Sequence, residues 1–225
     1  WKSAITMLDK KDNKIRHHFY IFLICPILIY NLYFSLADVY PFYKMRLPVG
    51  CVEFLKNIDS GKTILNYPRN AGYLEWELPD YQITIDMRIP HLFSDQEFFL
   101  TQNILFEPYI LDRFIKTYNP SFIMIPIELK TTSSILAERR DYVLVFFDDS
   151  EALYVNKKLH PDVALNYAIT EIDPFNINEL NIMELSEEAC ENIKKRMLKL
   201  NSIYSECYLI NQVIARIYHR QFKHD

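Results

Sequence analysis

The 225 residues of the chain are 50% apolar and 24% charged, and the net charge is −4 at neutral pH. Nucleic-acid-binding proteins need a clustered basic face, which this acidic balance does not favour, so we expect no nucleic acid partner. The only three glycines, Gly50, Gly61 and Gly72, lie too far apart for a phosphate-binding loop or a dinucleotide fingerprint.

The first predicted element is an uncharged run of nineteen residues from Phe19 to Ala37. Its length suits the hydrocarbon core of a bilayer, which takes about twenty apolar residues. Five cations precede the run and two follow it, at Lys2, Lys10, Lys11, Lys14, Arg16, Lys44 and Arg46. By the positive-inside rule we predict a basic cytoplasmic segment at 1–18 and a transmembrane helix at 19–40. The protein is then located in the cell (inner) membrane, and the rest of the chain is extracytoplasmic.

Two alternatives for this run remain open. A buried core helix is usually shorter and more interrupted by polar residues, and here only Asn31 and Ser35 are polar. A cleaved signal peptide is suggested by Ser35-Leu36-Ala37, which resembles a small-x-small cleavage site. The run is longer than the roughly 7–15 apolar residues of an ordinary signal peptide, so we favour a retained membrane span.

Strands and helices alternate in the segment 41–160, which we expect to form an α/β domain. A helix is predicted from Pro48 to Ile58, followed by a strand at 62–67. Asn70 is expected to cap a short helix at 71–76, and YQITID at 81–86 alternates like a strand.

The second half of this domain begins with a long amphipathic helix, predicted at 95–118. A buried strand at 121–127 and a helix at 132–139 follow. Strands at 142–147 and 152–155 flank the turn Asp148-Asp149-Ser150 and are close enough to pair as an antiparallel hairpin. The expected fold is a small, mostly parallel α/β sandwich with this hairpin at the edge of its sheet.

From residue 161 to 225 the pattern is mainly helical, with helices predicted at 186–200 and 202–222. Their combined length matches one tetratricopeptide-like hairpin, which either packs on the α/β domain or begins an array. The four cysteines lack metal-binding spacing, so we expect no zinc site. Cys190 and Cys207 are candidates for a disulfide across the helical hairpin, with free thiols as the alternative.

An ordered series of motifs runs through the α/β domain: Pro48-x-Gly50-x-Val52-Glu53-Phe54-Leu55, Ile64-Leu65-Asn66-Tyr67, Ala71-Gly72-Tyr73-Leu74-x-Trp76-x-Leu78-Pro79, Ile85-Asp86-x-Arg88 and Ala152-Leu153-Tyr154-Val155. This series resembles the C-terminal extracytoplasmic domain of bacterial glycosyltransferase-C-like membrane proteins of the dolichyl-phosphate-mannose mannosyltransferase type. The resemblance covers about 41–174. It implies that further spanning segments precede Trp1, and that the acidic residues of sugar transfer lie outside this chain.

Asp86 and Arg88 are expected at the C-terminal end of a strand, where open α/β sheets place ligands, with a structural ion pair as the alternative. Tyr73 and Trp76 are expected to form an aromatic lip on the short helix. Two positions near these residues depart from the family pattern. Ala71 replaces the first of two paired glycines, and Met87 replaces a glycine between an aspartate and an arginine. The candidate ligand-binding residues are Gly72, Tyr73, Trp76, Asp86 and Arg88.

No catalytic residue, cofactor or metal site is predicted for this chain. Asp148 and Asp149 are adjacent, but paired aspartates at a turn usually accept hydrogen bonds from local backbone donors. We therefore expect an accessory extracytoplasmic domain whose partners are the bilayer and a lipid-linked glycan or its acceptor. The alternative is a single-pass, membrane-anchored module that binds a protein partner through its helical tail.

Overall fold

The computed structural model describes residues 22, 24–30, 32, 47–58, 63–84, 94, 99–100 and 103–224. The chain divides into two units, Trp1–Lys44 and Met45–Asp225. In the first unit residues 24–30 are helical and their side chains are exposed. Most of the predicted span at 19–37 lies outside the described residues, and none of the described helices is both long and apolar enough to cross a membrane.

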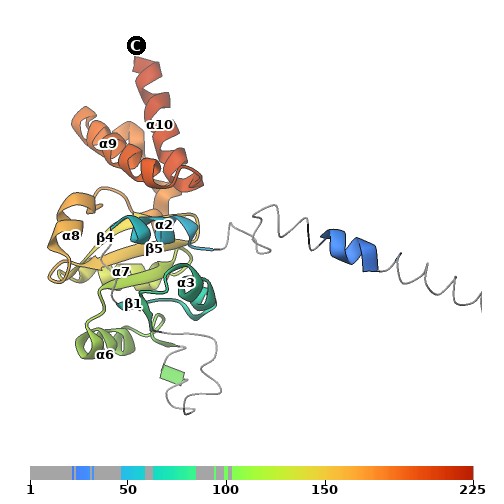
Figure 1. Ribbon diagram of the computed structural model, residues 1–225. Coiled ribbons are helices and arrows are strands. Elements are labelled where there is room, and N and C mark those ends of the chain that lie inside the picture. The colour runs from blue at the N-terminus through green and yellow to red at the C-terminus, as the bar shows by residue number, and fades with distance from the viewer. Residues whose placement is uncertain are drawn as a thin grey trace, which may run out of the picture. The chain divides into compact units, whose positions relative to one another are not determined.

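The second unit is an α/β structure built on one five-stranded sheet with the strand order β2-β1-β3-β5-β4 (Figure 1). The strands are β1 (Thr63–Leu65), β2 (Gln82–Ile83), β3 (Phe122–Pro126), β4 (Tyr142–Phe147) and β5 (Glu151–Asn156). All five residues of β3 and all six of β5 are buried, as expected for strands that are covered on both faces.

The strand pairing corrects the prediction of a mostly parallel sheet. β1 pairs in parallel with β2 and β3, whereas β5 pairs antiparallel with both β3 and β4. The sheet is therefore mixed, because β5 inserts between β3 and β4. The antiparallel hairpin is confirmed, and β4 is one of the two edge strands, with an irregularity between Leu144 and Phe146.

Helices cover both faces of this sheet. On one face lie α2 (Val49–Asn57), the 3₁₀ turn η2 (Pro68–Asn70) and α3 (Ala71–Glu77), and Asn70 contacts the side chain of Glu151 in β5. On the other face α7 (Lys130–Glu138) contributes Ser133, which bonds the Tyr154 hydroxyl. Glu151 and Tyr154 point to opposite faces because side chains alternate along a strand.

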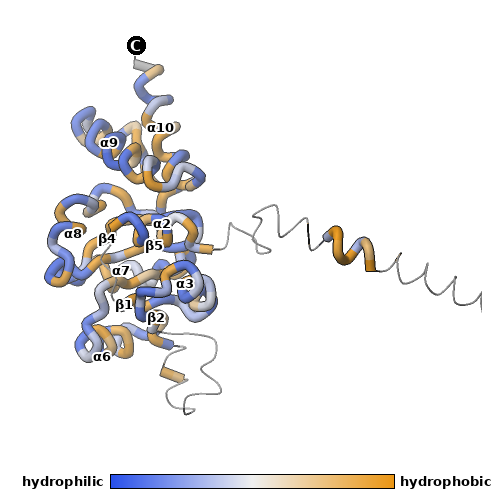
Figure 2. Tube along the Cα trace, in the orientation of Figure 1, coloured by the Kyte–Doolittle hydropathy of each residue, from blue (hydrophilic) through white to orange (hydrophobic). Residues whose placement is uncertain are grey.

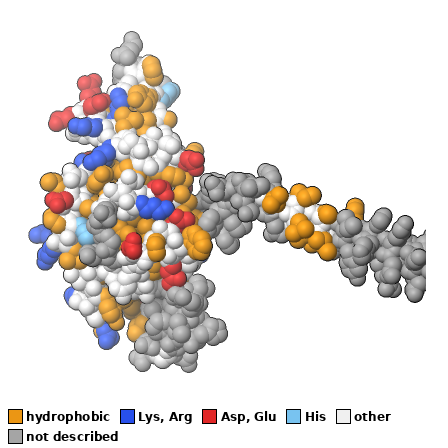
Figure 3. Space-filling view, viewed as in Figure 1, with side chains coloured by type: hydrophobic (Ala, Val, Ile, Leu, Met, Phe, Trp, Pro, Cys, Tyr) orange, Lys and Arg blue, Asp and Glu red, His pale blue; other side chains and the backbone are white. Residues whose placement is uncertain are grey.

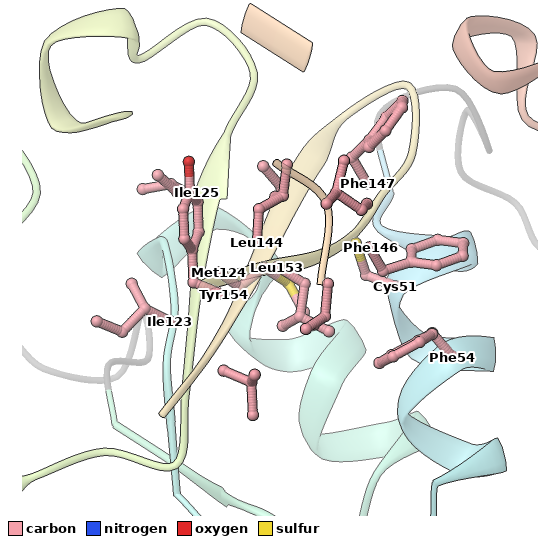
Figure 4. Close-up of a cluster of buried hydrophobic side chains, with 14 of the residues drawn as sticks. Cys51, Phe54, Ile123, Met124, Ile125, Leu144, Phe146, Phe147, Leu153 and Tyr154 are labelled. Carbon is pink, nitrogen blue, oxygen red and sulfur yellow. The ribbon is translucent and has the colours of Figure 1, made fainter. Parts of the chain in front are cut away.

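The core lies between these layers, and Figure 4 shows part of it. Phe54 of α2 stacks on Phe146 of β4, with ring centroids 5.0 Å apart. The same Phe54 ring meets the edge of Tyr167 in α8 (Pro161–Tyr167), also at 5.0 Å. These contacts explain why the apolar positions of α2 are buried.

The helix predicted at 95–118 is interrupted: the described residues 99, 100 and 103 are helical, but the helix does not continue through 104–107. The described helix α6 covers only Pro108–Tyr118, and residues 104–106 form a turn. The break has a local cause, because a residue before proline avoids the helical conformation and Glu107 is extended. Arg139 then links α6 to β4 by donating to Asp112 at 2.5 Å and to Asp141 at 2.8 Å.

The tail contains two short 3₁₀ segments, η3 (Pro174–Glu179) and η4 (Ile182–Glu184), and two long helices, α9 (Glu187–Ile203) and α10 (Tyr208–His224). α9 and α10 pack against each other, and α9 also contacts α2, so the tail packs on the α/β domain. The break between the helices lies at 204–207 rather than at the predicted Asn201-Ser202. Cys190 and Cys207 are buried free thiols, so the candidate disulfide is not formed.

Candidate functional site

Four buried polar side chains gather at the edge of the sheet where the parallel strands end. Asn66 follows β1, Asn70 ends η2, Asp148 follows β4 and Glu151 begins the antiparallel β5. Each is at most 2% exposed. Open α/β sheets place their ligands at this edge, so we call these four residues the edge cluster and take it as the candidate site.

Asp148 is fully used as a hydrogen-bond acceptor. Its Oδ1 accepts from the Ser150 backbone N–H and hydroxyl and from the Glu151 N–H, at 2.9–3.0 Å. Its Oδ2 accepts from the Cys51 N–H at 3.0 Å and so caps the first turn of α2. Burial raises the pKa of Asp148, and these backbone donors act in the opposite direction. We conclude that Asp148 holds α2 to the hairpin turn.

Glu151 is the chemically unusual member of the edge cluster. Its Oε1 accepts a hydrogen bond from the Asn70 Nδ2. Among the described residues, neither Glu151 Oε2 nor Asn70 Oδ1 has a hydrogen-bond partner. Burial raises the pKa of Glu151 well above its usual range, and the nearby Asp148 charge raises it further. Burial and the neighbouring Asp148 charge therefore both favour the protonated form of Glu151.

Cys51 lies beside these carboxyls but is poorly suited to nucleophilic catalysis. The side chain is fully buried, and its Sγ is 3.6 Å from the Glu151 carbonyl oxygen. Burial, and then the Asp148 charge, raise the pKa of the Cys51 thiol well above its usual value. Because the thiolate is the reactive form, this thiol stays inert.

Asp149 caps a different helix from its neighbour Asp148. Its carboxylate accepts from the backbone N–H groups of Tyr208 and Leu209 at 2.9 and 2.8 Å, at the start of α10. The next N–H of α10, that of Ile210, is 3.5 Å from Cys207 Sγ. The expectation of local backbone donors is met by Asp148, through Ser150 and Glu151, whereas the backbone donors of Asp149 lie 59 and 60 residues away. One turn thereby fixes both α2 and α10.

The structure places three of the five predicted ligand-binding residues on α3. Trp76 is 73% exposed, whereas Tyr73 is half-buried and packs on the core. Gly72 is exposed, and a Cβ added there would meet nothing within 4 Å, so the position does not require glycine. Asp86 and Arg88 lie outside the described residues.

The prediction that the Asn70 side chain caps α3 is wrong. Asn70 occupies the position before the helix, but its side chain makes no capping hydrogen bond and instead reaches Glu151. α3 therefore starts directly over the edge cluster, which lies beneath the helix that carries Gly72 and Trp76.

A cavity of about 640 Å³ lies on the opposite face of the sheet, between α7, β4 and the segment 169–176. Its polar lining is largely paired: Lys130 donates to Asn176 at 2.5 Å, and Asn176 donates to Asp173 at 2.7 Å. Because these groups already bond one another, the cavity is a weaker candidate for a ligand site than the edge cluster.

The part of the chain that the structure describes contains no group of three or more histidine, cysteine or acidic side chains that would hold a metal ion. The edge cluster brings together two carboxyls and two amides, with the Cys51 thiol beside them. The exposed Arg69 is close enough to oppose the rise in the pKa of Glu151. This set suits structural fixation and binding, and it lacks a nucleophile activated by a base.

Sequence reasoning missed the roles of Asn70 and Glu151. Asn70 precedes a helix, where capping is the usual role of asparagine. Glu151 follows a polar turn, where an exposed side chain is the ordinary expectation. Only one signal was available, namely that Glu151 directly precedes the buried strand sequence Ala152–Val155.

Comparison of this chain with protein-family models, with curated proteins and with solved structures found no match.

Proposed function

We propose that this chain is an accessory, non-catalytic extracytoplasmic domain of a glycosyltransferase-C-like membrane protein, held at the cell membrane by the span at 19–37. In this proposal the domain binds a lipid-linked glycan or its acceptor through the surface around α3. The parent protein supplies the residues that transfer the sugar.

One observation supports the proposal above the others: the described segments that carry the family resemblance meet at the edge cluster. The first motif forms the start of α2, where Cys51 donates to Asp148. The second motif contains the end of β1 and Asn66. The third motif forms α3, and the last motif lies in β5 directly after Glu151. Segments that are far apart in the sequence thus converge on one edge of the sheet, where ligands bind in this fold class.

The chemistry of the edge cluster supports binding rather than catalysis. Asp148 is saturated by four donors, and burial raises the pKa of both Glu151 and Cys51. On α3, the helix that follows Asn70, Trp76 offers an exposed aromatic ring of the kind that packs on apolar or sugar surfaces.

The test uses the full chain in phosphatidylcholine liposomes with polyprenyl-phosphate mannose as the probe. Trp76 is one of only two tryptophans, and Trp1→Phe makes it the only reporter of binding by fluorescence. We expect saturable binding without release or transfer of mannose. The matched comparison is between the variants Trp76→Tyr and Trp1→Phe. Their affinities for the probe are measured by displacement of a labelled probe.

We expect Trp76→Tyr to weaken binding about threefold, because the smaller tyrosine ring keeps an aromatic contact but covers less of the ligand surface. Mannose transfer by the chain alone would show that it is an enzyme and overturn the accessory role. Binding that is absent, or equal in Trp76→Tyr and Trp1→Phe, would remove the α3 surface as the site.

A further inference from the structure

Glu151 occupies a fixed position within the sheet. It begins β5, the strand between β3 and β4, and its partner in β3 is Pro126. The residue is fully buried, and its backbone N–H donates to Asp148 Oδ1 while its backbone oxygen accepts from the Asp148 N–H, each at 2.9 Å. Because β5 is paired on both sides, we expect a charge on Glu151 to displace the neighbouring segments rather than the strand.

The groups around Glu151 favour a neutral carboxyl. The titratable and charged side chains that act on it come from the β4–β5 turn, α2, η2 and the start of α7: Asp148, Cys51, Arg69 and Glu128. Burial and the two neighbouring carboxyls raise the pKa of Glu151, whereas Arg69, which is exposed, and the Asn70 amide lower it. Ionised Glu151 is therefore a buried carboxylate with one side-chain donor, which is an unfavourable arrangement.

One proton completes the contact between Glu151 and Asn70. The Asn70 Nδ2 donates to Glu151 Oε1, and the oxygens without a partner among the described residues are the second oxygen of each group, Glu151 Oε2 and Asn70 Oδ1. Both are acceptors when Glu151 is ionised, so they cannot bond each other. A protonated carboxyl has one O–H donor, which donates to the amide oxygen while the amide donates back. Each buried oxygen then has a partner.

The segment that carries Asn70 is weakly held elsewhere. Asn70 directly precedes α3, which buries only Ala71 and Leu74 and is largely hydrophilic in Figure 2. The C-terminal turn of α3 is joined to α2 by an ion pair between Glu77 and Lys56 at 2.7 Å, and in Figure 3 acidic and basic side chains lie together over these helices. Exposed ion pairs add little stability, so η2 and α3 depend on the contact with Glu151.

We propose that Glu151 is a proton-binding site that controls η2 and α3: the protonated carboxyl pairs with Asn70 and holds both segments on the sheet, and ionisation releases them. Loss of the proton removes one hydrogen bond and leaves a buried charge beside the Asp148 carboxyl. Water reaches this charge by local displacement of η2 and α3. The inference deepens the proposed function, on which it rests for one consequence only, namely that binding at the α3 surface weakens as pH rises.

Hydrogen exchange of the full chain in detergent tests the inference between about pH 5 and pH 8, above the ordinary glutamate pKa of about 4.3. The readout is the protection of the backbone amides at 75–78, which bond within α3, relative to their intrinsic exchange rates. Glu151→Gln is the matched variant, because a glutamine amide forms both hydrogen bonds with Asn70 but does not titrate. The amides at 193–200 in α9 report on the rest of the second unit.

In the wild-type protein we expect protection at 75–78 to fall roughly tenfold per pH unit between the ordinary glutamate pKa and the raised value of the closed form, because opening releases one proton. Protection at 75–78 in Glu151→Gln should not change with pH, and protection at 193–200 should be the same in both proteins. Asn70→Ala should show low protection at 75–78 at every pH, and circular dichroism verifies that this variant folds.

An equal loss of protection with pH in the wild-type protein and Glu151→Gln overturns the inference, as does a wild-type pH profile in Asn70→Ala. An equal loss at 193–200 also overturns it, because Glu151 then acts on the whole unit rather than on α3. Displacement of labelled polyprenyl-phosphate mannose at both ends of the pH range separates the two proposals. Absent binding with pH-dependent exchange refutes the proposed function alone, whereas binding with identical exchange in the wild-type protein and Glu151→Gln refutes this inference alone.

Discussion

Replacing Asp149 with alanine tests whether the hairpin turn holds the tail in place. The Asp149 carboxylate accepts two backbone N–H groups at the start of α10, at 2.9 and 2.8 Å. Loss of a capping side chain costs about 1 kcal/mol and up to about 2. A negative charge near a helix N-terminus contributes about 0.3–1 kcal/mol more. We therefore expect Asp149→Ala to lower the free energy of unfolding by about 2 kcal/mol.

Asp149→Asn is the matched control, because asparagine caps a helix about as well as aspartate but carries no charge. We expect it to cost about 0.5 kcal/mol, the size of the charge effect alone. Urea unfolding of the full chain in detergent gives the free energies, and hydrogen exchange at residues 208–211 locates the change. Equal losses in the two variants, or faster exchange spread evenly over the domain, would refute the proposed capping contact.

Three further substitutions test the packing and the edge cluster. Gly50→Ala should destabilise the fold by about 1–3 kcal/mol, because its Cβ would lie 2.8 Å from Tyr204 Cδ1 and 2.9 Å from Asp148 Cβ. Gly72→Ala, on the exposed side of α3, should stabilise the helix by up to about 1 kcal/mol. Thermal melts measure both glycine variants, and a lower melting temperature for Gly72→Ala would contradict the open surroundings of this position. Folding raises the pKa of Glu151 above its value in the unfolded chain. The protonated Glu151 therefore adds to the free energy of unfolding at a pH below the ordinary glutamate pKa, and this contribution is lost as pH rises through the pKa of the folded protein. In urea titrations, the free energy of unfolding of Glu151→Gln should therefore fall less between acidic and neutral pH than that of the wild-type protein. An identical fall in the two proteins would mean that Glu151 is charged in the folded state.

The sequence predicted the elements well where one strong signal decided the outcome. The strand at 142–147 was located correctly because a continuous apolar run is followed by the turn Asp148-Asp149-Ser150. The break within the helix predicted at 95–118 was missed because the apolar periodicity passes through Pro108, whose effect on the preceding residue is local. Strand order depended on pairing between distant segments, so the insertion of β5 between β3 and β4 had no local signal.

The candidate site was harder to predict for the same reason. Asn70 and Glu151 are 81 residues apart, and each has an ordinary local role that the sequence favours. Their contact appears only when the sheet brings η2 to the start of β5. Trp76 was identified correctly as an aromatic side chain on a short helix, and its exposure agrees with the predicted binding role without testing it.

The position of Asp148 and Asp149 in the chain has a consequence for synthesis on the ribosome. The cap of α2 is supplied 97 residues after Cys51, and Asp149 precedes the helix it caps by 59 residues. A nascent chain that ends before Asp148 lacks the residue that caps α2, and α2 and α10 are both capped only after the hairpin turn has formed. Such long-range contacts form only after the later partner has been synthesised, so this unit folds late in elongation. We therefore expect ribosome-bound chains to resist protease in this unit only after the hairpin, α2 and α10 have all left the exit tunnel.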